Sequence, residues 1–301
     1  GGLNYTNTIV TGTPAGSGTG SYLWAIPSNV IASDRNTTIK LKVQTADGGT
    51  SAVSANNLTI QAQIVLIQPN GGQTLYVDNP DDGTDNYQIS WTTYGQVPQV
   101  KLYYDNNSGL GADGIGGNAD DYQGLIAGGA AVSNLEGYSW SVPNAIGTKL
   151  RVKVASSVSS TNVYVNSASD FTIKGKIILS TPTAADTGAN AWKINSATLP
   201  SSHLIQWKNC GDLGTVNIYY SDNGGTQYVL VTTATGASGN QNYSWQPPAT
   251  WGTPTARNTI GVDNKIKITA ASDEANVFAE SANFELKGQL SITVPGGGEV
   301  Y

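Results

Sequence analysis

One sequence unit recurs along this chain with a period near 113 residues, and it limits the possible folds more than any single motif does. Each unit opens with an apolar segment that ends in a proline, and the three openings begin at Ile64, Ile177 and Leu290. These starts are 113 residues apart both times (177 − 64 and 290 − 177). A chain with such a period is expected to fold as several similar domains, each with its own hydrophobic core.

Aromatic residues occupy matching positions in successive units, which predicts packing roles for them. The matched positions are Trp24, Trp140 and Trp245; Trp91 and Trp207; the pairs Tyr103-Tyr104 and Tyr219-Tyr220; and Tyr76, Trp192 and Tyr301, which follow the opening proline turn. Six of the seven tryptophans therefore belong to the repeated pattern. Trp251 lies outside it, near Pro247, Pro248 and Pro254, and we predict a loop position where it contacts a ligand or another subunit.

Alternating apolar and basic residues predict strands with one buried face and one wet face. The pattern is clearest at 39–43, 150–154 and 265–268. Only 12% of the residues are charged and 36 are glycine, which is typical of strands joined by tight turns. The sequence thus predicts an all-β fold of tandem immunoglobulin- or fibronectin-like antiparallel β-sandwiches, with about seven strands in each.

The period also predicts the domain boundaries. Residues 1–63 are expected to form the C-terminal half of an Ig-like repeat, 64–176 and 177–289 two full repeats, and 290–301 the opening strand of a further one. A half sandwich exposes strand edges that recruit other strands. Two explanations remain open: the chain is an excerpt of a longer tandem array, or strands of neighbouring subunits complete its ends.

The motifs together resemble a known class of domain. Pro69-Asn-Gly-Gly72, Ile89-Ser-Trp91, Tyr138-Ser-Trp140-Ser-Val-Pro143 and Leu150-Arg-Val-Lys-Val154 resemble the Ig-like repeats of large prokaryotic cell-surface and extracellular proteins. They are also similar to the Ig-like N-terminal domain of Ser/Thr-rich, GPI-anchored fungal wall proteins. The resemblance covers essentially the whole chain and implies a structural or adhesive surface role, without supplying catalytic residues.

Composition argues against several classes of function. With 15 basic and 21 acidic residues and no basic cluster, the chain lacks the grouped cations that nucleic acid requires. No apolar run is long enough to span a bilayer. The single histidine, His203, matches Tyr87 of the other copy, so we expect no Ser-His-Asp site and no enzyme. Cys210 is the only cysteine, so the chain cannot form an internal disulfide. We expect Cys210 to be a small, half-buried apolar residue.

Two kinds of modification or ion site are predicted from loops. The segment 105–121 is longer than its counterpart at 221–225 and rich in oxygen ligands, although its spacing is not that of an EF-hand. Calcium would bind through Asp105, Asn107, Asp113, Asp120 and Asp121; a solvated turn is the alternative.

Acceptor triplets for N-glycosylation occur at Asn4, Asn36, Asn57, Asn106 and Asn242.

The leading hypothesis is the structural repeat region of an extracellular fibre, filament, stalk or surface layer, secreted or at the cell surface. Its expected partners are copies of itself or adjacent repeats of the same chain, and beyond calcium no cofactor is expected. One alternative is an adhesin or carbohydrate-binding module that meets surface glycans, and it loses its main support if Trp192 and Trp251 are buried. Another is an accessory region of a secreted hydrolase.

Overall fold

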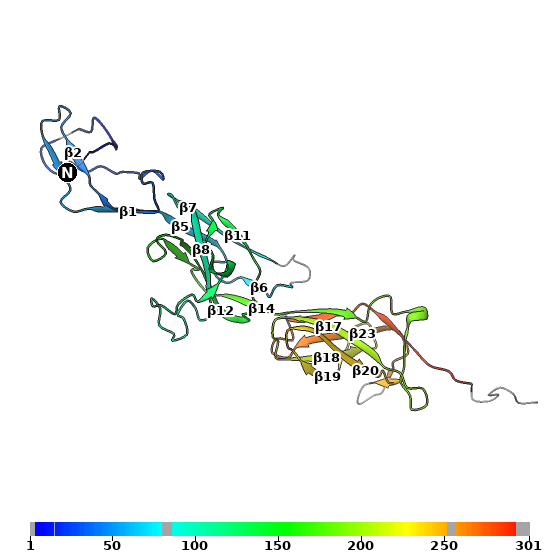
Figure 1. Cartoon of the computed structure of the whole chain (residues 1–301). Coiled ribbons are helices and arrows are strands. Elements are labelled where there is room, and N and C mark those ends of the chain that lie inside the picture. The colour runs from blue at the N-terminus through cyan, green and yellow to red at the C-terminus, as the bar shows by residue number, and fades with distance from the viewer. Residues whose placement is uncertain (1–3, 15, 80–85, 252–256, 293–301) are drawn as a thin grey trace, which may run out of the picture. The chain divides into compact units, whose positions relative to one another are not determined.

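The computed structural model describes residues 4–14, 16–79, 86–251 and 257–292 (Figure 1). Strands dominate this part of the chain, and the helical structure in it is two 3-10 turns, η1 (Ala127–Gly129) and η2 (Gly188–Asn190). No helix among these residues has the length and hydropathy needed to cross a membrane. The chain divides into two compact units: Gly1–Gln73, Gln88–Trp140 and Thr148–Phe171 in the first, and Thr74–Tyr87, Ser141–Gly147 and Thr172–Tyr301 in the second.

The strands of residues 63–174 form two sheets, ordered β11-β7-β5 and β10-β8-β12-β14-β6, with β9 on β8 and β13 on β12. Their bounds are β5 Gln63–Gln68, β6 Thr74–Tyr76, β7 Tyr87–Tyr94, β8 Gln99–Asp105, β9 Gly124–Leu125, β10 Val132–Ser133, β11 Gly137–Trp140, β12 Gly147–Ser156, β13 Tyr164–Asn166 and β14 Phe171–Lys174. The pair β14 and β6 is parallel, whereas β5 with β7 and β8 with β12 are antiparallel. This is the two-sheet arrangement of an Ig-like sandwich.

The strands of residues 176–287 repeat this arrangement in sheets ordered β15-β17-β20 and β16-β25-β23-β18-β19, with β24 on β23. Their bounds are β15 Lys176–Thr181, β16 Trp192–Lys193, β17 His203–Cys210, β18 Thr215–Ser221, β19 Val229–Thr235, β20 Gly239–Trp245, β23 Gly261–Ala270, β24 Phe278–Glu280 and β25 Phe284–Lys287, and a separate ribbon pairs β21 (Thr250–Trp251) with β22 (Arg257–Asn258). The predicted fold class, all-β sandwiches, is confirmed.

The core between the sheets of the second sandwich follows from period-two alternation along each strand. On β23 the side chains of Ile266 and Ile268 are fully buried, whereas Lys265 and Lys267, which alternate with them, are half-buried on the opposite face. Aromatic side chains fill the middle of this core, because each removes a large apolar area from water. The buried aromatic residues are Trp192, Trp207, Tyr220, Trp245 and Phe284.

One matched aromatic position differs from the sequence alignment. Trp192 was aligned with Tyr76, but in the parallel pairs Trp192 lies opposite Leu286 while Leu75 lies opposite Ile173. Trp192 therefore takes the place of Leu75, and both side chains are buried, whereas Tyr76 is 44% exposed. The alignment was wrong by one residue, and one residue in a strand moves a side chain to the opposite face.

Residues 4–62 form little sheet structure. Strand β1 (Arg35–Ile39) pairs with β4 (Leu58–Gln61), and β2 (Lys42–Gln44) pairs with β3 (Ser51–Val53). The segment 20–27 carries the Tyr-Trp-Pro signature but is not a strand, and Leu23 in it is 95% exposed. The corresponding strand of the second sandwich, β20, pairs with β17, and the described residues 4–14 and 16–34 contain no strand of that kind.

The C-terminal segment is described only as far as Ile292. Leu290 and Ile292 are 101% and 82% exposed, and residues 290–292 are not in a strand. Most of the predicted opening strand at 290–301, including Tyr301, lies outside the described residues. The predicted domain boundaries at 64, 177 and 290 stay predictions.

Truncating a side chain at the centre of the second core tests the packing. Ile268→Ala should lower the free energy of unfolding by about 2–5 kcal/mol, because it removes buried contacts and leaves a cavity. Leu204→Ala on the same sandwich should lower the free energy of unfolding much less than Ile268→Ala does, because Leu204 is 48% exposed. Urea unfolding followed by tryptophan fluorescence compares the two, and equal costs would contradict the assigned core.

Candidate functional site

The junction at residues 61–63 lies within the first unit. Strand β4 ends at Gln61 and β5 begins at Gln63, so Ala62 is the one residue between them. Asp34 lies beside it: its carbonyl accepts the Ala62 amide at 2.7 Å. The buried carboxylate of Asp34 accepts hydrogen bonds from the Ser159 amide (3.2 Å), the Ser159 hydroxyl (3.1 Å) and the Ser156 hydroxyl. Gln61 Nε2 donates to the carbonyl of Asn162 at 3.3 Å. Residues ahead of β5 thus hold the turn between β12 and β13.

The junction at residues 174–176 lies within the second unit, and Gly175 is the one residue between β14 and β15. Lys174 Nζ is 2.7 Å from Asp273 Oδ2, in the turn between β23 and β24. Hydrogen bonds from Lys174 and Asn276 hold the pKa of Asp273 below its ordinary value. A second pairing adds to this contact, because Asn144 Nδ2 donates to Asp212 Oδ2 at 2.7 Å and Asn144 Oδ1 accepts the Asp212 amide at 2.9 Å.

The two junctions use the same positions of the sequence unit. Gln61 and Lys174 each end the last strand before the junction, and each contacts the turn after the long strand of the next sandwich. That turn has the same closing bond in both sandwiches, from Val163 to the carbonyl of Ser159 and from Val277 to the carbonyl of Asp273. The recurrence makes these contacts a property of the repeated unit.

Close packing at both junctions requires glycine in the turn after β7 and after β17. Gly95 and Gly211 have φ values of +99° and +88°, which favour glycine. A Cβ on Gly95 would lie 3.0 Å from the Cβ of Ala62, and one on Gly211 would lie 2.9 Å from Ile146 Cδ1 and 3.0 Å from Asn144 Oδ1. These junctions therefore leave no room for a side chain.

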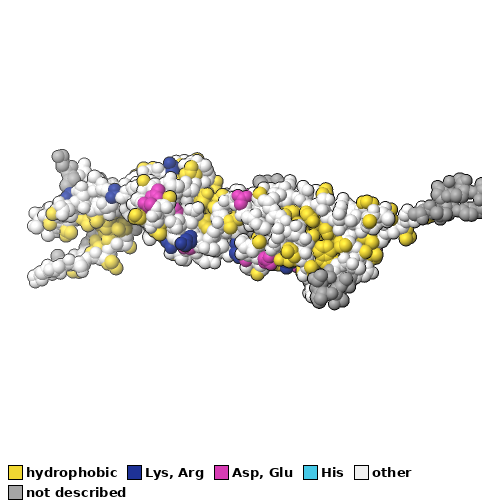
Figure 2. Space-filling model, turned by 90° about the horizontal axis from the view of Figure 1, so that it is seen from below, with side chains coloured by type: hydrophobic (Ala, Val, Ile, Leu, Met, Phe, Trp, Pro, Cys, Tyr) yellow, Lys and Arg dark blue, Asp and Glu magenta, His cyan; other side chains and the backbone are white. Residues whose placement is uncertain are grey.

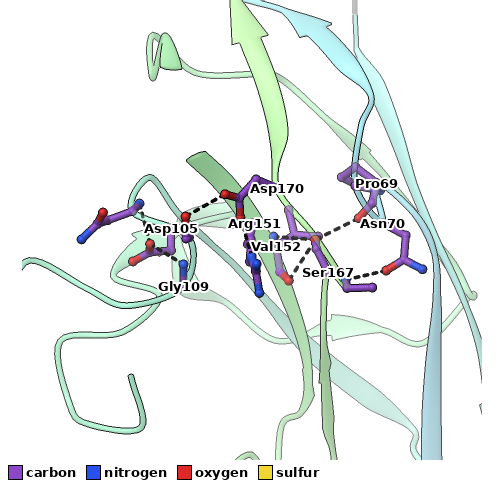
Figure 3. Close-up of polar contacts among 12 residues, drawn as sticks. Pro69, Asn70, Asp105, Gly109, Arg151, Val152, Ser167 and Asp170 are labelled. Atoms are coloured by element: carbon purple, nitrogen blue, oxygen red, sulfur yellow. Dashed lines mark hydrogen bonds and ion pairs between the residues drawn. The ribbon is translucent and has the colours of Figure 1, made fainter. Parts of the chain in front are cut away.

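The loop that was predicted to bind calcium is held together by its own carboxylates. Asp105 is buried, and its Oδ1 accepts the amides of Asn107 (2.7 Å) and Gly109 (2.9 Å), as Figure 3 shows. The other carboxylates do similar work: Asp120 Oδ2 accepts the amides of Ala112 and Asp113, Asp113 Oδ1 accepts that of Ile115, and Asp121 Oδ2 accepts that of Gly117. The bonds from Asn107 to Asp105 and from Ile115 to Asp113 are those of Asx turns.

The same carboxylates do not converge on one point. Among the described residues, no three acidic, histidine or cysteine side chains are grouped as metal ligands. Oδ1 of Asp121 is buried and has no hydrogen-bond partner in the described part of the chain. Calcium binding by Asp105, Asn107, Asp113, Asp120 and Asp121 stays a prediction.

A polar network ties this loop to the long strand β12. Asp170 accepts from Arg151 Nε at 2.6 Å and from the Ser108 hydroxyl at 2.7 Å (Figure 3). Beside it, the buried hydroxyl of Ser167 accepts the Val152 amide at 3.0 Å and donates to the carbonyl of Pro69 at 2.9 Å. Burial alone would raise the pKa of Asp170, but the bonds from Arg151 and Ser108 outweigh it and hold that pKa below its ordinary value.

The structure places the single histidine and the single cysteine in packing positions. The ring of His203 stacks on Trp192 at 4.7 Å between centroids, and its Nε2 accepts the Lys193 amide at 2.9 Å. Burial is the largest influence on the pKa of His203 and lowers it. Cys210 is buried more fully than expected, and its thiol is not in a disulfide.

The tryptophans on which a sugar platform would depend face the second core. Trp192 is 4% exposed. Trp251 is half-buried and packs edge-on against Tyr220 at 6.0 Å between ring centroids. The predicted loop position of Trp251 is wrong, because Trp251 lies on the short strand β21, which pairs with β22. Its predicted contact with a ligand or subunit stays a prediction.

Most of the glycosylation candidates lie where a glycan could attach. Asn4, Asn57, Asn106 and Asn242 are exposed, and Asn36 is half-buried, with its Oδ1 accepting the Thr38 amide at 2.9 Å. Modification of these residues stays a prediction.

Sequence reasoning missed a lysine that lies against aromatic rings on the outer sheet face. Lys153 Nζ is 5.7 Å from the ring centroid of Tyr122 and 4.5 Å from that of Tyr164. The equivalent Lys267 lies 5.4 Å from Tyr228 and 4.2 Å from Phe278. The sequence shows that basic residues recur on the alternating strands, and this could have marked the two lysines. It could not show their aromatic partners, because these lie in other segments of the chain.

The Arg151–Asp170 pair predicts a pH dependence of stability. Because folding lowers the pKa of Asp170, its stabilisation is complete above the unfolded-state value of about 3.9 and is lost as pH falls through the lower folded value. Asp170→Asn should therefore destabilise the protein most at neutral pH, and the difference from wild type should shrink below about pH 4. Urea unfolding across that range measures it, and a difference that does not change with pH would contradict the assignment.

Comparisons with known proteins add only coarse information. No family model matches the chain, and no curated protein matches it. Among solved structures, the chain is similar to CBD12 from CALX1.2 at 9% identity, over 71% of this chain and 83% of that one, with a TM-score of 0.22. It is also similar to dimeric latent PorU from Porphyromonas gingivalis at 11% identity, over 88% of this chain and 25% of that one, with a TM-score of 0.25. At such TM-scores, the fold is assigned from the sheets themselves.

Proposed function

We propose that this chain is a non-enzymatic structural repeat region of an extracellular fibre, filament, stalk or surface layer. The observation that carries the proposal is the recurrence of one set of junction contacts at residues 61–63 and 174–176. A chain that only needed to connect independent domains would be served by a flexible linker. The one-residue connections at Ala62 and Gly175 instead favour mechanical coupling of neighbouring sandwiches.

The character of the contacts supports the same role. Each junction combines close packing around a glycine with polar contacts, such as Lys174 with Asp273 and Asp34 with Ser159. Packing resists sliding, and hydrogen bonds of fixed geometry resist rotation. Load applied along the chain would then pass through these contacts to the strands beside them.

Assembly through strand complementation is part of the proposal. In the second sandwich Ile177, in the opening strand, is buried, whereas Leu290 at the corresponding position is fully exposed. Segment 20–27 likewise exposes Leu23 and lacks the strand that pairs with its counterpart β20. We propose that these exposed apolar segments pair with a further strand, supplied either by adjacent repeats of the same chain or by another copy.

Substitution at a junction glycine tests the coupling, with a matched control in the same turn. Gly211 and Gly214 both have positive φ (+88° and +71°), but an added Cβ meets neighbours only at Gly211. Gly211→Ala should lower the free energy of unfolding by about 1–3 kcal/mol more than Gly214→Ala, because it overpacks the junction. Urea unfolding compares the two variants.

The same variants should differ in mobility across the junction. Spin labels on the exposed positions Leu125 and Leu230 report the distance distribution between the two sandwiches, and Cys210 is buried, which favours selective labelling. The proposal expects a narrow distribution in the wild type and in Gly214→Ala, and a broader one in Gly211→Ala. A broad distribution in the wild type would overturn mechanical coupling.

A further inference from the structure

The outer face of the second sandwich has a hollow that the roles described so far do not use. It measures about 400 Å³, which lies at the small end of the range of ligand sites. Its lining residues are Tyr219, Tyr228, Lys267, Thr269, Glu274 and Ala275. Figure 2 shows one face of the molecule, on which hydrophobic side chains are grouped among few charged ones.

Strand pairing brings the lining residues together. Tyr219 on β18 lies directly opposite Lys267 on β23, and Thr269 lies two residues farther along β23 on the same face. The turn between β23 and β24 adds Glu274 above them. The floor and one rim of the hollow are therefore built on paired strands.

The charge of Lys267 is already balanced. Its Nζ lies 3.2 Å from Glu280 Oε1 and over the ring of Tyr228. An anionic ligand would have to compete with Glu280 for this ammonium group. The lining holds one cation, Lys267, and one carboxylate, Glu274, and Glu280 already pairs with Lys267, so the hollow disfavours phosphates and other anions.

The rim supplies hydrogen-bond acceptors beside the aromatic rings. Glu274 is exposed, and its Oε1 accepts from Asn217 and from the Tyr219 hydroxyl, the latter at 3.0 Å. Within the described part of the chain its second oxygen, Oε2, accepts no hydrogen bond, so it can accept one from a ligand. Thr269 is 1% exposed, and its hydroxyl has no hydrogen-bond partner among the described residues. Burial and then Glu274 raise the pKa of Tyr219, which keeps its hydroxyl protonated as a donor.

The strands of the first full sandwich match those around the hollow, but some of the side chains at this place differ. Val152 opposite Tyr104 corresponds to Ile266 opposite Tyr220, so Ala155 stands where the second sandwich has Thr269. The turn residue Ser160 replaces Glu274, and Tyr122 over Lys153 is 6% exposed. The hydroxyl of Thr269 and the carboxylate of Glu274 are thus particular to the second sandwich.

We propose that this hollow binds one pyranose unit, a hexose or an N-acetylhexosamine, of a neutral glycan. The aromatic faces of Tyr219 and Tyr228 would contact the C–H face of the sugar ring, and Glu274 would accept its hydroxyl groups. The site lies within one sandwich, so it does not rest on the junctions or on the structural role proposed above.

The test uses the full chain with four neutral oligosaccharides as probes: maltohexaose, cellohexaose, mannohexaose and chitohexaose. Saturation-transfer NMR detects which of them binds, and titration gives the dissociation constant. Tyr219→Ala and Glu274→Gln should each weaken binding by about 10-fold or more, which is about 1.4 kcal/mol. Tyr103→Ala, at the matching position of the first full sandwich, should leave binding unchanged.

Each outcome decides the proposal. Binding that is lost in Tyr219→Ala and Glu274→Gln but kept in Tyr103→Ala supports it, and Glu274 is exposed, so its variant separates loss of binding from loss of folding. No binding by any of the four probes overturns it, as does binding that all three variants retain. Displacement of a bound probe by tetramethylammonium, with tighter binding of that cation, would assign the hollow to cationic ligands instead.

Discussion

Alternation between a buried and a wet face along each long strand is the constraint on which the rest of this structure depends. On β12 and β23 it places aliphatic side chains between two sheets and leaves basic residues outside, so the same strand builds the core and the surface. Because the aromatic positions of both sandwiches are registered to these strands, shifting either strand by one residue would reverse its faces. The junction turn and the outer hollow are both carried by the same strand.

The fold could be predicted from the sequence because its signals are local and repeated. Trp91 and Trp207 mark strands that pair as the alternation predicts, and their burial follows from their size. Trp192 shows the limit of the method: the segments after the proline turns differ in length, so matching aromatic to aromatic chose Tyr76 and missed Leu75 by one position. Segment 20–27 shows another limit, because a strand signature forms a strand only when a partner is present.

The candidate sites were much less predictable, because their members are far apart in the sequence. Asp34 and Ser159 meet across 125 residues, and Lys174 and Asp273 across 99. No spacing rule relates such pairs, and each residue alone is an ordinary polar residue in a loop. The acidic loop at 105–121 had the opposite character: its composition suggested ligands, but local hydrogen bonds to its own backbone account for many of its carboxylate oxygens.

Each sequence unit carries both halves of a junction: the end of its last strand, represented by Lys174, and the two turns that receive such an end, represented by Gly211 and Asp273. Duplication of one unit would therefore add a strand end and the two turns that receive it at the same time. No further substitutions would be needed to form the new junction. An interface of this head-to-tail kind does not close on itself unless rotation brings its ends together. Chain length can then change in evolution by whole units, while the free energy of the array grows in nearly equal steps.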